Sequence, residues 1–406
     1  MDKVELILMN ISGLDRPGVT SALTEILARH DARILDIGQA DIHHSLSLGI
    51  LFRTSPERSG DILKDLLFKC YELSVKIRFT PVSVEDYEAW VSRQGKNRWI
   101  ITILGRQLTA RHIALVTDEI ARQQLNIDGI QRLTGRMPLD ADEEPQSKSC
   151  VEFSVRGNPL DLNAMRGRFL QLAQQEEFDI SLQEDNVFRR CRRLICFDMD
   201  STLIETEVID ELAERAGVGD KVRAITERAM RGEIEFCESF RERVALLEGL
   251  DERVMREIAE NLPVTEGVER MMQVLKRTGY KTAILSGGFT YFGNWLKQKF
   301  GFDYVYANEL EIVDGKLTGR YLGDIVDGKR KAELLRIIAQ VENIDIAQTI
   351  AVGDGANDLP MLATAGLGIA FHAKPKVKQT ARQSISTIGL DGVLYFLGFK
   401  DSFIAS

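Results

Sequence analysis

Apolar positions divide this chain into two parts with different periodicities. In the N-terminal half, apolar and β-rich runs alternate with amphipathic segments in the order strand, helix, strand, strand, helix, strand. The first unit extends from an apolar run at residues 3–12 to a strand at residues 74–79, and a polar stretch at residues 83–97 follows it. The same order begins again at Trp99 and ends near Ile180, which predicts a tandem repeat of βαββαβ units.

From Arg190 onward, predicted strands alternate with longer helices, which indicates a parallel α/β sheet with crossover helices. The stretch from Glu205 to Lys276 is almost entirely helical in pattern and too long for one crossover, so we expect an inserted helical cap. The expected strands cover residues 193–197, 282–285, 304–307, 350–352 and 367–370. The expected domains are residues 1–84, 97–185 and 186–406, with the cap at about residues 205–276.

Composition and charge narrow the class of protein. Hydrophobic residues make up 44% of the chain and charged residues 28%, which is ordinary for a globular protein. A net charge of −9 disfavours a nucleic-acid partner, and no apolar run predicts a membrane span or a signal peptide, so we expect a cytoplasmic protein. The five cysteines lack CxxC spacing and are predicted to be reduced thiols, and the acidic stretch Leu139–Pro145 is predicted to be a solvated loop.

Two carboxylates follow the first strand of the α/β part. Asp198 and Asp200 come directly after the apolar run at residues 193–197, which places them at the carboxyl edge of a parallel sheet. One carboxylate can attack phosphorus, while the other protonates the leaving oxygen and later deprotonates water. We predict that Asp198 is the nucleophile and that Asp200 is the general acid and base.

Two further segments suit a phosphoryl group. Ser286 and Gly287 end a predicted strand and offer a hydroxyl and a main-chain amide to phosphate oxygens. A lysine that opens the helix near Gly328 could neutralise the charge on the nucleophile and the transferring group. Lys331 fits the expected helical phase better than Lys329, whose role stays open.

The segment Val352–Asp358 follows another predicted strand and supplies oxygen ligands on a glycine-rich loop, as Mg²⁺ requires. Asn357 is a further candidate for contact with the substrate. The predicted metal ligands are Asp198, Asp200 and Asp354, with Asp358 in support. Each motif alone is a weak signal, but four in order, each at the end of a strand or the start of a helix, are specific.

On these motifs the chain resembles the haloacid dehalogenase superfamily, and from Arg190 to about Leu397 it is similar to the phosphoserine phosphatase family within it. The resemblance implies magnesium-dependent hydrolysis of O-phosphoserine through an aspartyl-phosphate. It also implies that Glu207 contacts the substrate ammonium and that Arg243 binds its carboxylate, with Met230 and Phe236 as apolar cover. Further substrate contacts are implied for Ser286, Gly287, Lys331 and Asn357.

The first repeat resembles an ACT domain, a βαββαβ ligand-sensing module. The turn that contains Asp15 and Gly18 matches the segment where such modules bind amino acids, and a helix N-terminus suits a carboxylate. We therefore expect serine as a regulatory ligand there. The second repeat departs from this pattern at Gly105–Ala110. The alternative is a structural pair of repeats that only mediates dimerisation, and a homodimer is expected in either case.

Two other functions stay open at this point. A related enzyme could act on a different phosphomonoester or transfer phosphate to an alcohol. A protein of another class, a non-catalytic amino-acid sensor, would bind without turnover. All the charged groups that the chemistry requires are present, so we expect an enzyme.

Overall fold

The computed structural model describes residues 4–92, 95, 97–136, 147–381 and 383–404. The side chain of Met230 and the predicted loop at residues 139–145 lie outside this description. The chain forms two compact units, Met1–Lys96 and Asn97–Ser406. In the described part, all five cysteines are free, as predicted, and no helix is long and apolar enough to cross a membrane.

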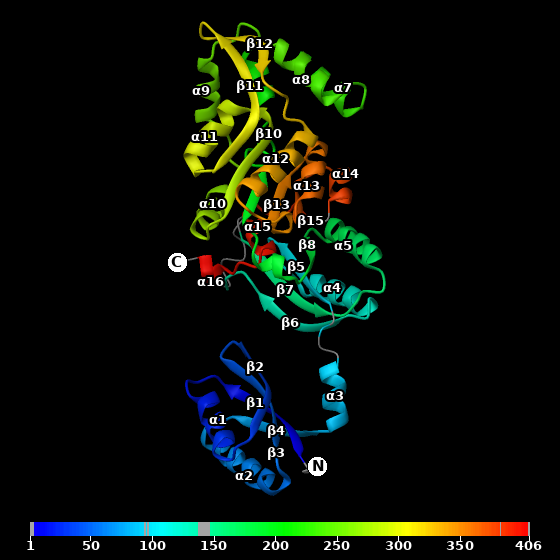
Figure 1. Ribbon diagram of the computed structural model, residues 1–406, viewed down its shortest axis with the longest axis vertical. Coiled ribbons are helices and arrows are strands. Elements are labelled where there is room, and N and C mark those ends of the chain that lie inside the picture. Colours follow the sequence, from blue (N-terminus) through cyan, green and yellow to red (C-terminus); the bar gives the residue numbers. More distant parts are fainter. Residues whose placement is uncertain (1–3, 93–94, 96, 137–146, 382, 405–406) are drawn as a thin grey trace. The chain divides into compact units, whose positions relative to one another are not determined.

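The first unit has the predicted order of elements (Figure 1). These are β1 (Glu5–Leu14), α1 (Val19–Arg29), β2 (Arg33–Ile42), β3 (Ser45–Thr54), α2 (Pro56–Glu72) and β4 (Lys76–Val82). The strands form an antiparallel sheet in the order β2-β3-β1-β4. Apolar side chains of α1 and α2 pack with those of β1 and β3 in one core. Much of the polar stretch after β4 forms a helix, α3 (Val84–Ser92), which buries none of its residues.

The second repeat is confirmed as well. It consists of β5 (Arg98–Gly105), α4 (Ala110–Arg122), β6 (Asn126–Arg132), β7 (Ser149–Arg156), α5 (Leu162–Glu176) and β8 (Asp179–Glu184). Its sheet has the order β6-β7-β5-β8. β5 and β8 are buried along nearly their whole length, whereas β1 of the first repeat has exposed positions. Continuous burial requires cover on both faces of a strand, and α15 (Gly392–Phe396) and β15 (Gln383–Ile385) of the next domain supply it.

The α/β part has a seven-stranded sheet in the order β12-β11-β10-β9-β13-β14-β15. All neighbours are parallel except β11 and β12. The remaining strands are β9 (Leu194–Phe197), β10 (Lys281–Phe289), β11 (Tyr304–Val313), β12 (Lys316–Leu322), β13 (Thr349–Gly353) and β14 (Leu367–Phe371). The flanking helices are α10 (Val268–Arg277), α11 (Thr290–Phe300), α12 (Gly328–Val341), α13 (Leu359–Thr364), α14 (Pro375–Thr380) and the terminal α16 (Asp401–Ile404). β9 lies at the centre, so the residues that follow it occupy the middle of the carboxyl edge.

The stretch between β9 and α10 contains four helices, α6 (Val208–Arg215), α7 (Gly219–Met230), α8 (Phe236–Ala245) and α9 (Arg253–Glu260). The β11–β12 hairpin also belongs to this region, which the sequence pattern did not indicate. β12 packs on α8, where the rings of Phe240 and Tyr321 are 5.4 Å apart. Arg241 Nε donates a hydrogen bond to Tyr321 Oη at 3.1 Å. The hairpin therefore supports the cap from the core sheet.

Charged side chains join the second repeat to the α/β domain. Arg106 donates two hydrogen bonds to the carboxylate of Glu266, at 2.9 and 2.5 Å. Lys148 and Arg270 both contact the fully buried Asp391, at 2.6 and 2.7 Å. Arg106 stands in the turn where the second repeat departs from the ACT pattern. In this repeat the turn contacts the neighbouring domain.

Candidate active site

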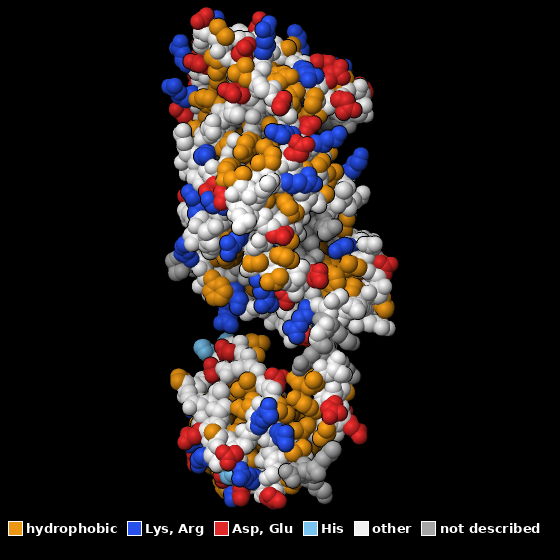
Figure 2. Space-filling view, in the orientation of Figure 1, with side chains coloured by type: hydrophobic (Ala, Val, Ile, Leu, Met, Phe, Trp, Pro, Cys, Tyr) orange, Lys and Arg blue, Asp and Glu red, His pale blue; other side chains and the backbone are white. Residues whose placement is uncertain are grey.

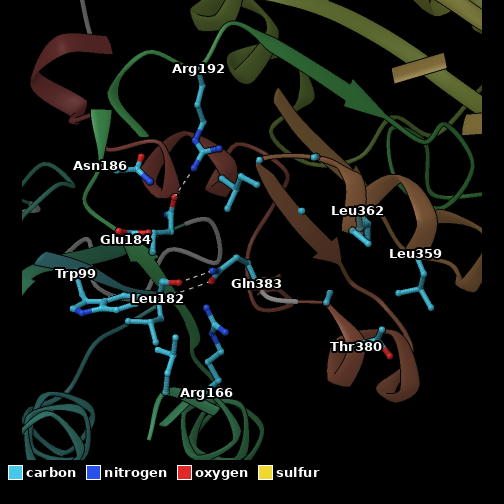
Figure 3. A pocket seen from close by; sticks show the side chains of 18 residues that line it. Trp99, Arg166, Leu182, Glu184, Asn186, Arg192, Leu359, Leu362, Thr380 and Gln383 are labelled. Atoms are coloured by element: carbon cyan, nitrogen blue, oxygen red, sulfur yellow. Dashed lines mark hydrogen bonds between the residues drawn. The ribbon is translucent and has the colours of Figure 1, made fainter. Parts of the chain in front are cut away.

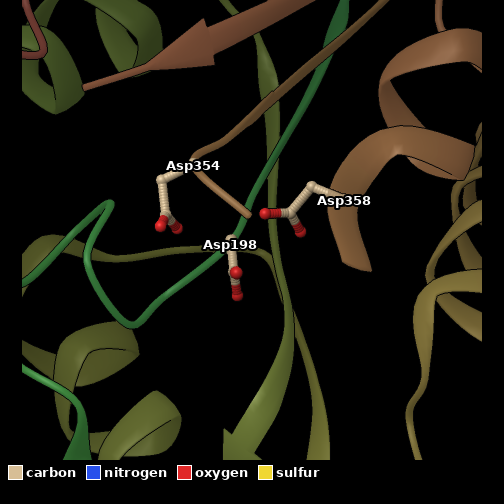
Figure 4. Close-up of side chains that lie close together, drawn as sticks. All are labelled: Asp198, Asp354 and Asp358. Atoms are coloured by element: carbon tan, nitrogen blue, oxygen red, sulfur yellow. The ribbon is translucent and has the colours of Figure 1, made fainter. Parts of the chain in front are cut away.

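Three carboxylates meet at the carboxyl edge of the sheet. Asp198 directly follows β9, Asp354 directly follows β13, and Asp358 directly precedes α13. One oxygen from each lies within 4.8 Å of the others, and Figure 4 shows the three side chains close together on these segments. Asp358, predicted only as a supporting residue, is one of these three carboxylates in the structure.

Lys331 is the cation among these acids. Its side chain is fully buried, and its Nζ lies 2.9 Å from Asp198 Oδ1 and 2.7 Å from Asp358 Oδ1. Burial alone would lower the pKa of Lys331, but Asp198 and Asp358 raise it above its ordinary value, so the amine stays charged. Lys329 is exposed. The helical phase of α12 thus places Lys331 in the site and Lys329 outside it.

The loop after β13 is crowded, which explains its glycines. A Cβ on Gly353 would lie 2.4 Å from Asp358 Cγ, and Gly355 N donates to Asp358 Oδ2 at 3.0 Å. Burial and repulsion from Asp198 raise the pKa of Asp354 to about 8 and that of Asp358 to about 7. These shifts and the excess of carboxylates over Lys331 fit a site for a divalent cation. Asn357 lies in the same loop and is half-buried.

The carboxylate of Asp200 lies apart from that group, although sequence analysis included Asp200 among the metal ligands. Its Oδ1 accepts a hydrogen bond from Val208 N at 3.5 Å, and a Cβ on Gly288 would lie 2.6 Å from its Oδ2. Burial, followed by repulsion from Glu207 and Asp198, raises the pKa of Asp200 well above its ordinary value. A carboxyl group that keeps its proton suits a general acid.

Ser286 and Gly287 lie near the end of β10, beside β9. Ser286 is fully buried and its Oγ accepts a hydrogen bond from Gly288 N at 2.9 Å. The ring of Phe236 lies 3.1 Å from the position that a Cβ on Gly287 would take, so Phe236 of the cap covers this loop. Only glycine leaves the main chain open to a ligand under such a close aromatic ring.

Asn308 is a residue of this site that sequence analysis missed. It is buried in β11, and its Nδ2 donates to Gly287 O at 2.7 Å while its Oδ1 accepts from Val326 N at 2.8 Å. It therefore connects the Ser286 loop to the segment that leads into α12 and Lys331. A buried amide requires partners, so an asparagine directly after the predicted strand at residues 304–307 was the available signal.

Glu207 and Arg243 extend from the first and third cap helices. Ser201 Oγ donates to Glu207 Oε1 at 3.0 Å, and Arg243 Nε donates to Ser239 O at 3.3 Å. Burial lowers the pKa of Arg243, which Glu207 and Asp210 raise. Burial and repulsion from Asp198 raise the pKa of Glu207, and the hydrogen bond from Ser201 opposes this rise. No ion pair between Glu207 and Arg243 occurs in the described structure, so each retains capacity for a ligand.

The predicted regulatory turn of the first repeat is exposed. Gly18 has a φ of 95°, a left-handed conformation that favours glycine, and it immediately precedes α1. Asp15 N donates to His44 O at 2.8 Å, which joins the turn to the β2–β3 hairpin. Both Asp15 and Gly18 are exposed. Both residues belong to the unit Met1–Lys96, and the three carboxylates belong to the unit Asn97–Ser406.

Comparisons with known proteins agree with this fold. A family model of haloacid dehalogenase-like hydrolases matches residues 195–363, and two ACT domain models match residues 5–80 and 98–183. A crystal structure of a haloacid dehalogenase family hydrolase from Salmonella enterica has a TM-score of 0.64 at 30% identity, covering 73% of this chain and 98% of that one. Fold and site together define a haloacid dehalogenase-like hydrolase with two ACT domains.

Sequence relatives narrow this class. A phosphoserine phosphatase of Streptomyces coelicolor is 39% identical over 396 residues, which cover 97% of this chain and 92% of the relative. One of Mycobacterium tuberculosis is 38% identical over 395 residues, covering 97% and 93%. The unliganded structure of a probable phosphoserine phosphatase from Vibrio cholerae has a TM-score of 0.57 at 35% identity, covering 75% of this chain and 87% of that one. The chain belongs to the phosphoserine phosphatase family.

Proposed function

We propose that this chain hydrolyses O-phospho-L-serine to L-serine and phosphate. The observation that carries the proposal is the position of Asp198, which lies at the centre of the carboxyl edge, 2.9 Å from the buried Lys331. Glu207 and Arg243, charges of opposite sign, extend from the cap helices and match an α-amino acid zwitterion. The names of the full-length relatives support the same substrate.

The residues divide the chemistry among them. Asp198 attacks phosphorus and forms an aspartyl-phosphate, while Asp200 gives its proton to the serine oxygen that leaves. Asp200 then takes a proton from the water that attacks the aspartyl-phosphate, which releases phosphate and restores Asp198. Lys331, Ser286 and the Gly287 amide bind the phosphoryl oxygens and stabilise their charge in both steps.

Asp198 and Asp354, supported by Asp358, would hold Mg²⁺. When bound, this ion neutralises phosphoryl charge and lowers the repulsion between the phosphate and the Asp198 carboxylate. Asp200 would contribute through a group other than its side-chain oxygens, because these face Val208 and Gly288.

Residues of the cap recognise the amino-acid part of the substrate. Arg243 retains its two terminal nitrogens for a carboxylate, since the contact with Ser239 uses only Nε. Glu207 accepts the substrate ammonium. Phe236, above Gly287, excludes water from the reacting group, and Asn357 is a further proposed contact.

Release of phosphate from O-phosphoserine by the purified full chain, with Mg²⁺ and with chelator, tests this proposal. Parallel assays use O-phosphothreonine and sugar phosphates as competing substrates, and added alcohols as alternative acceptors. We expect metal-dependent release with the highest kcat/KM on O-phosphoserine, and loss of turnover in Asp198→Asn at an unchanged melting temperature. A higher kcat/KM on another ester, or transfer to an alcohol, would replace the proposed substrate or reaction.

We further propose that serine binds the first repeat near Asp15 and Gly18 in a homodimer and changes the activity. The exposed left-handed Gly18 at the start of α1 leaves room for a carboxylate there. Serine titration of the full chain by calorimetry, compared with Gly18→Val, tests the binding site, and light scattering tests the dimer. Purely competitive inhibition by serine that Gly18→Val leaves unchanged would show that the repeat is structural.

A further inference from the structure

A cavity of about 480 Å³ lies between the second repeat and the α/β domain, away from the carboxylates of the active site. One wall comes from β5, α5 and β8, and the other from α13, β14 and the segment before β15. Figure 3 shows Arg192 and Arg166 on opposite sides of the pair formed by Leu182 and Gln383. The volume falls within the usual range of small-molecule sites, roughly 300–1,000 Å³.

Arg192 is the unusual group in this cavity. Its side chain is only 8% exposed, and it donates hydrogen bonds to two neutral acceptors: Gln183 Oε1 at 3.2 Å and Thr349 O at 3.5 Å. Among the residues that the structure describes, no carboxylate forms an ion pair with Arg192, and its buried Nε has no hydrogen-bond partner. Burial lowers the pKa of Arg192 to about 10, so the guanidinium remains charged at neutral pH. A buried charge without a counter-ion is costly.

The polar wall around Arg192 is held in place. Gln383 accepts a hydrogen bond from Leu182 N at 3.0 Å and donates one to Leu182 O at 2.8 Å. Gln183 Nε2 donates to Phe396 O at 2.8 Å. A second guanidinium, Arg166 of α5, also lines the cavity, and Glu184 is the one carboxylate among the lining residues that the structure describes. Arg192 therefore lies in a polar wall and has no ion-pair partner in the described part of the chain.

We propose that this cavity binds a small anion with a carboxylate or phosphate group, which pairs with the guanidinium of Arg192. Each terminal nitrogen of Arg192 contacts one neutral acceptor and so retains a second hydrogen for such a group, which a planar guanidinium can bind with both nitrogens. Water could accept these hydrogen bonds but supplies no charge. This inference does not depend on the identity of the substrate at Asp198.

The cavity has a direct structural link to the active site. Leu359, Leu362 and Ala363 of α13 line it, and α13 begins immediately after Asp358. Asp358 in turn contacts Lys331 at 2.7 Å. An occupant that shifts α13 would therefore move Asp358 and Lys331. We expect the anion to change the affinity of the active site for its substrate, by the roughly 5- to 150-fold range of ordinary coupling between two binding sites.

Calorimetry on the full chain tests the site with three probes: inorganic phosphate, L-serine and acetate, at constant ionic strength. The wild type is compared with Arg192→Met and with Arg190→Met, a matched control. Arg190 is exposed and pairs only with Asp185 in the described structure, so its loss removes the same charge without affecting the cavity. Phosphate and serine can also bind elsewhere, so the measured quantity is the binding event that Arg192→Met removes.

We expect one event with at least one probe to weaken by about tenfold or more in Arg192→Met and to persist in Arg190→Met. The probe identifies whether a carboxylate or a phosphate is the ligand. Without ligand, Arg192→Met should melt no lower than the wild type, because replacing an unpaired buried charge by an apolar side chain is often neutral or stabilising. Binding of all three probes that is identical in wild type and Arg192→Met would overturn the proposal.

A second variant tests the same site if Arg192→Met fails to fold. Ala363→Phe places a ring in the cavity from an exposed position of α13 and leaves Arg192 intact. Loss of the same binding event in this variant supports the site. An unchanged event in a folded Ala363→Phe protein would locate the anion elsewhere and refute the assignment.

Discussion

Arg243 offers the sharpest test of how the active site selects an amino acid. It is half-buried in α8, and burial already lowers its pKa, so its surroundings are poorly solvated. Its Nε contacts Ser239 O at 3.3 Å, which orients the two terminal nitrogens as a fork. The perturbation is Arg243→Met, which keeps the length of the apolar stem and removes the fork.

The expected loss of kcat/KM follows from the interaction between the Arg243 guanidinium and the substrate carboxylate. Loss of one partner of a desolvated, hydrogen-bonded charge pair costs about 2–5 kcal/mol. At about 1.4 kcal/mol for each factor of ten, kcat/KM for O-phosphoserine should fall roughly 30-fold to several thousand-fold. O-phosphoethanolamine keeps the phosphate and the ammonium but lacks the carboxylate, so its kcat/KM should change little.

The assay is continuous phosphate release with both substrates, and Arg241→Met is the matched control. Arg241 lies two residues earlier in the same helix, is exposed, and contacts Tyr321 Oη at 3.1 Å. Arg241→Met should leave both substrates nearly unaffected. Equal losses on the two substrates in Arg243→Met would refute the assignment of Arg243 to the carboxylate.

Three further changes have defined outcomes. Lys331→Met should lower kcat by about 10²–10³-fold in a phosphate-release assay, because it removes a cation from the reacting group; normal turnover would contradict this. Asp391→Asn should lower the free energy of unfolding by about 3–5 kcal/mol in urea titrations, since Lys148 and Arg270 lose a buried partner; an unchanged midpoint would argue against it. Without metal, the stability that protonated Asp354 contributes is present below pH about 4 and is lost as pH rises through about 8, because its folded-state pKa is raised to about 8. The melting temperature in chelator should therefore fall from pH 6 to pH 8, and Mg²⁺ should reduce that fall.

Local patterns in the sequence were sufficient for the elements and the order of the motifs. A βαββαβ unit has apolar runs and turns that are all local, so both repeats and their sheets were predicted from the chain alone. Asp198 and Asp354 each follow a buried strand, and parallel strands direct their carboxyl ends to one edge. Helical phase placed Lys331 correctly relative to Lys329 for the same reason, since it depends only on neighbouring residues.

Residues whose partners lie far along the chain escaped prediction. Arg106 pairs with Glu266, 160 residues away, and Asn308 connects two loops that are separate in sequence. The carboxylate of Asp358 lies within 4.8 Å of that of Asp198, whereas the carboxylate of Asp200 lies outside this group. The sequence placed both residues near the metal and could not distinguish these positions.

The sequence by itself determined the strands, the helices and the chemical groups at their ends, because these follow from local periodicity and backbone geometry. Only the tertiary structure decided which groups meet, and the second repeat shows why. Its packing on the α/β domain buries Arg192 beside Gln183 and creates the cavity, and neither residue is unusual in sequence. Burial and pairing depend on how distant surfaces fit together, which no local pattern records.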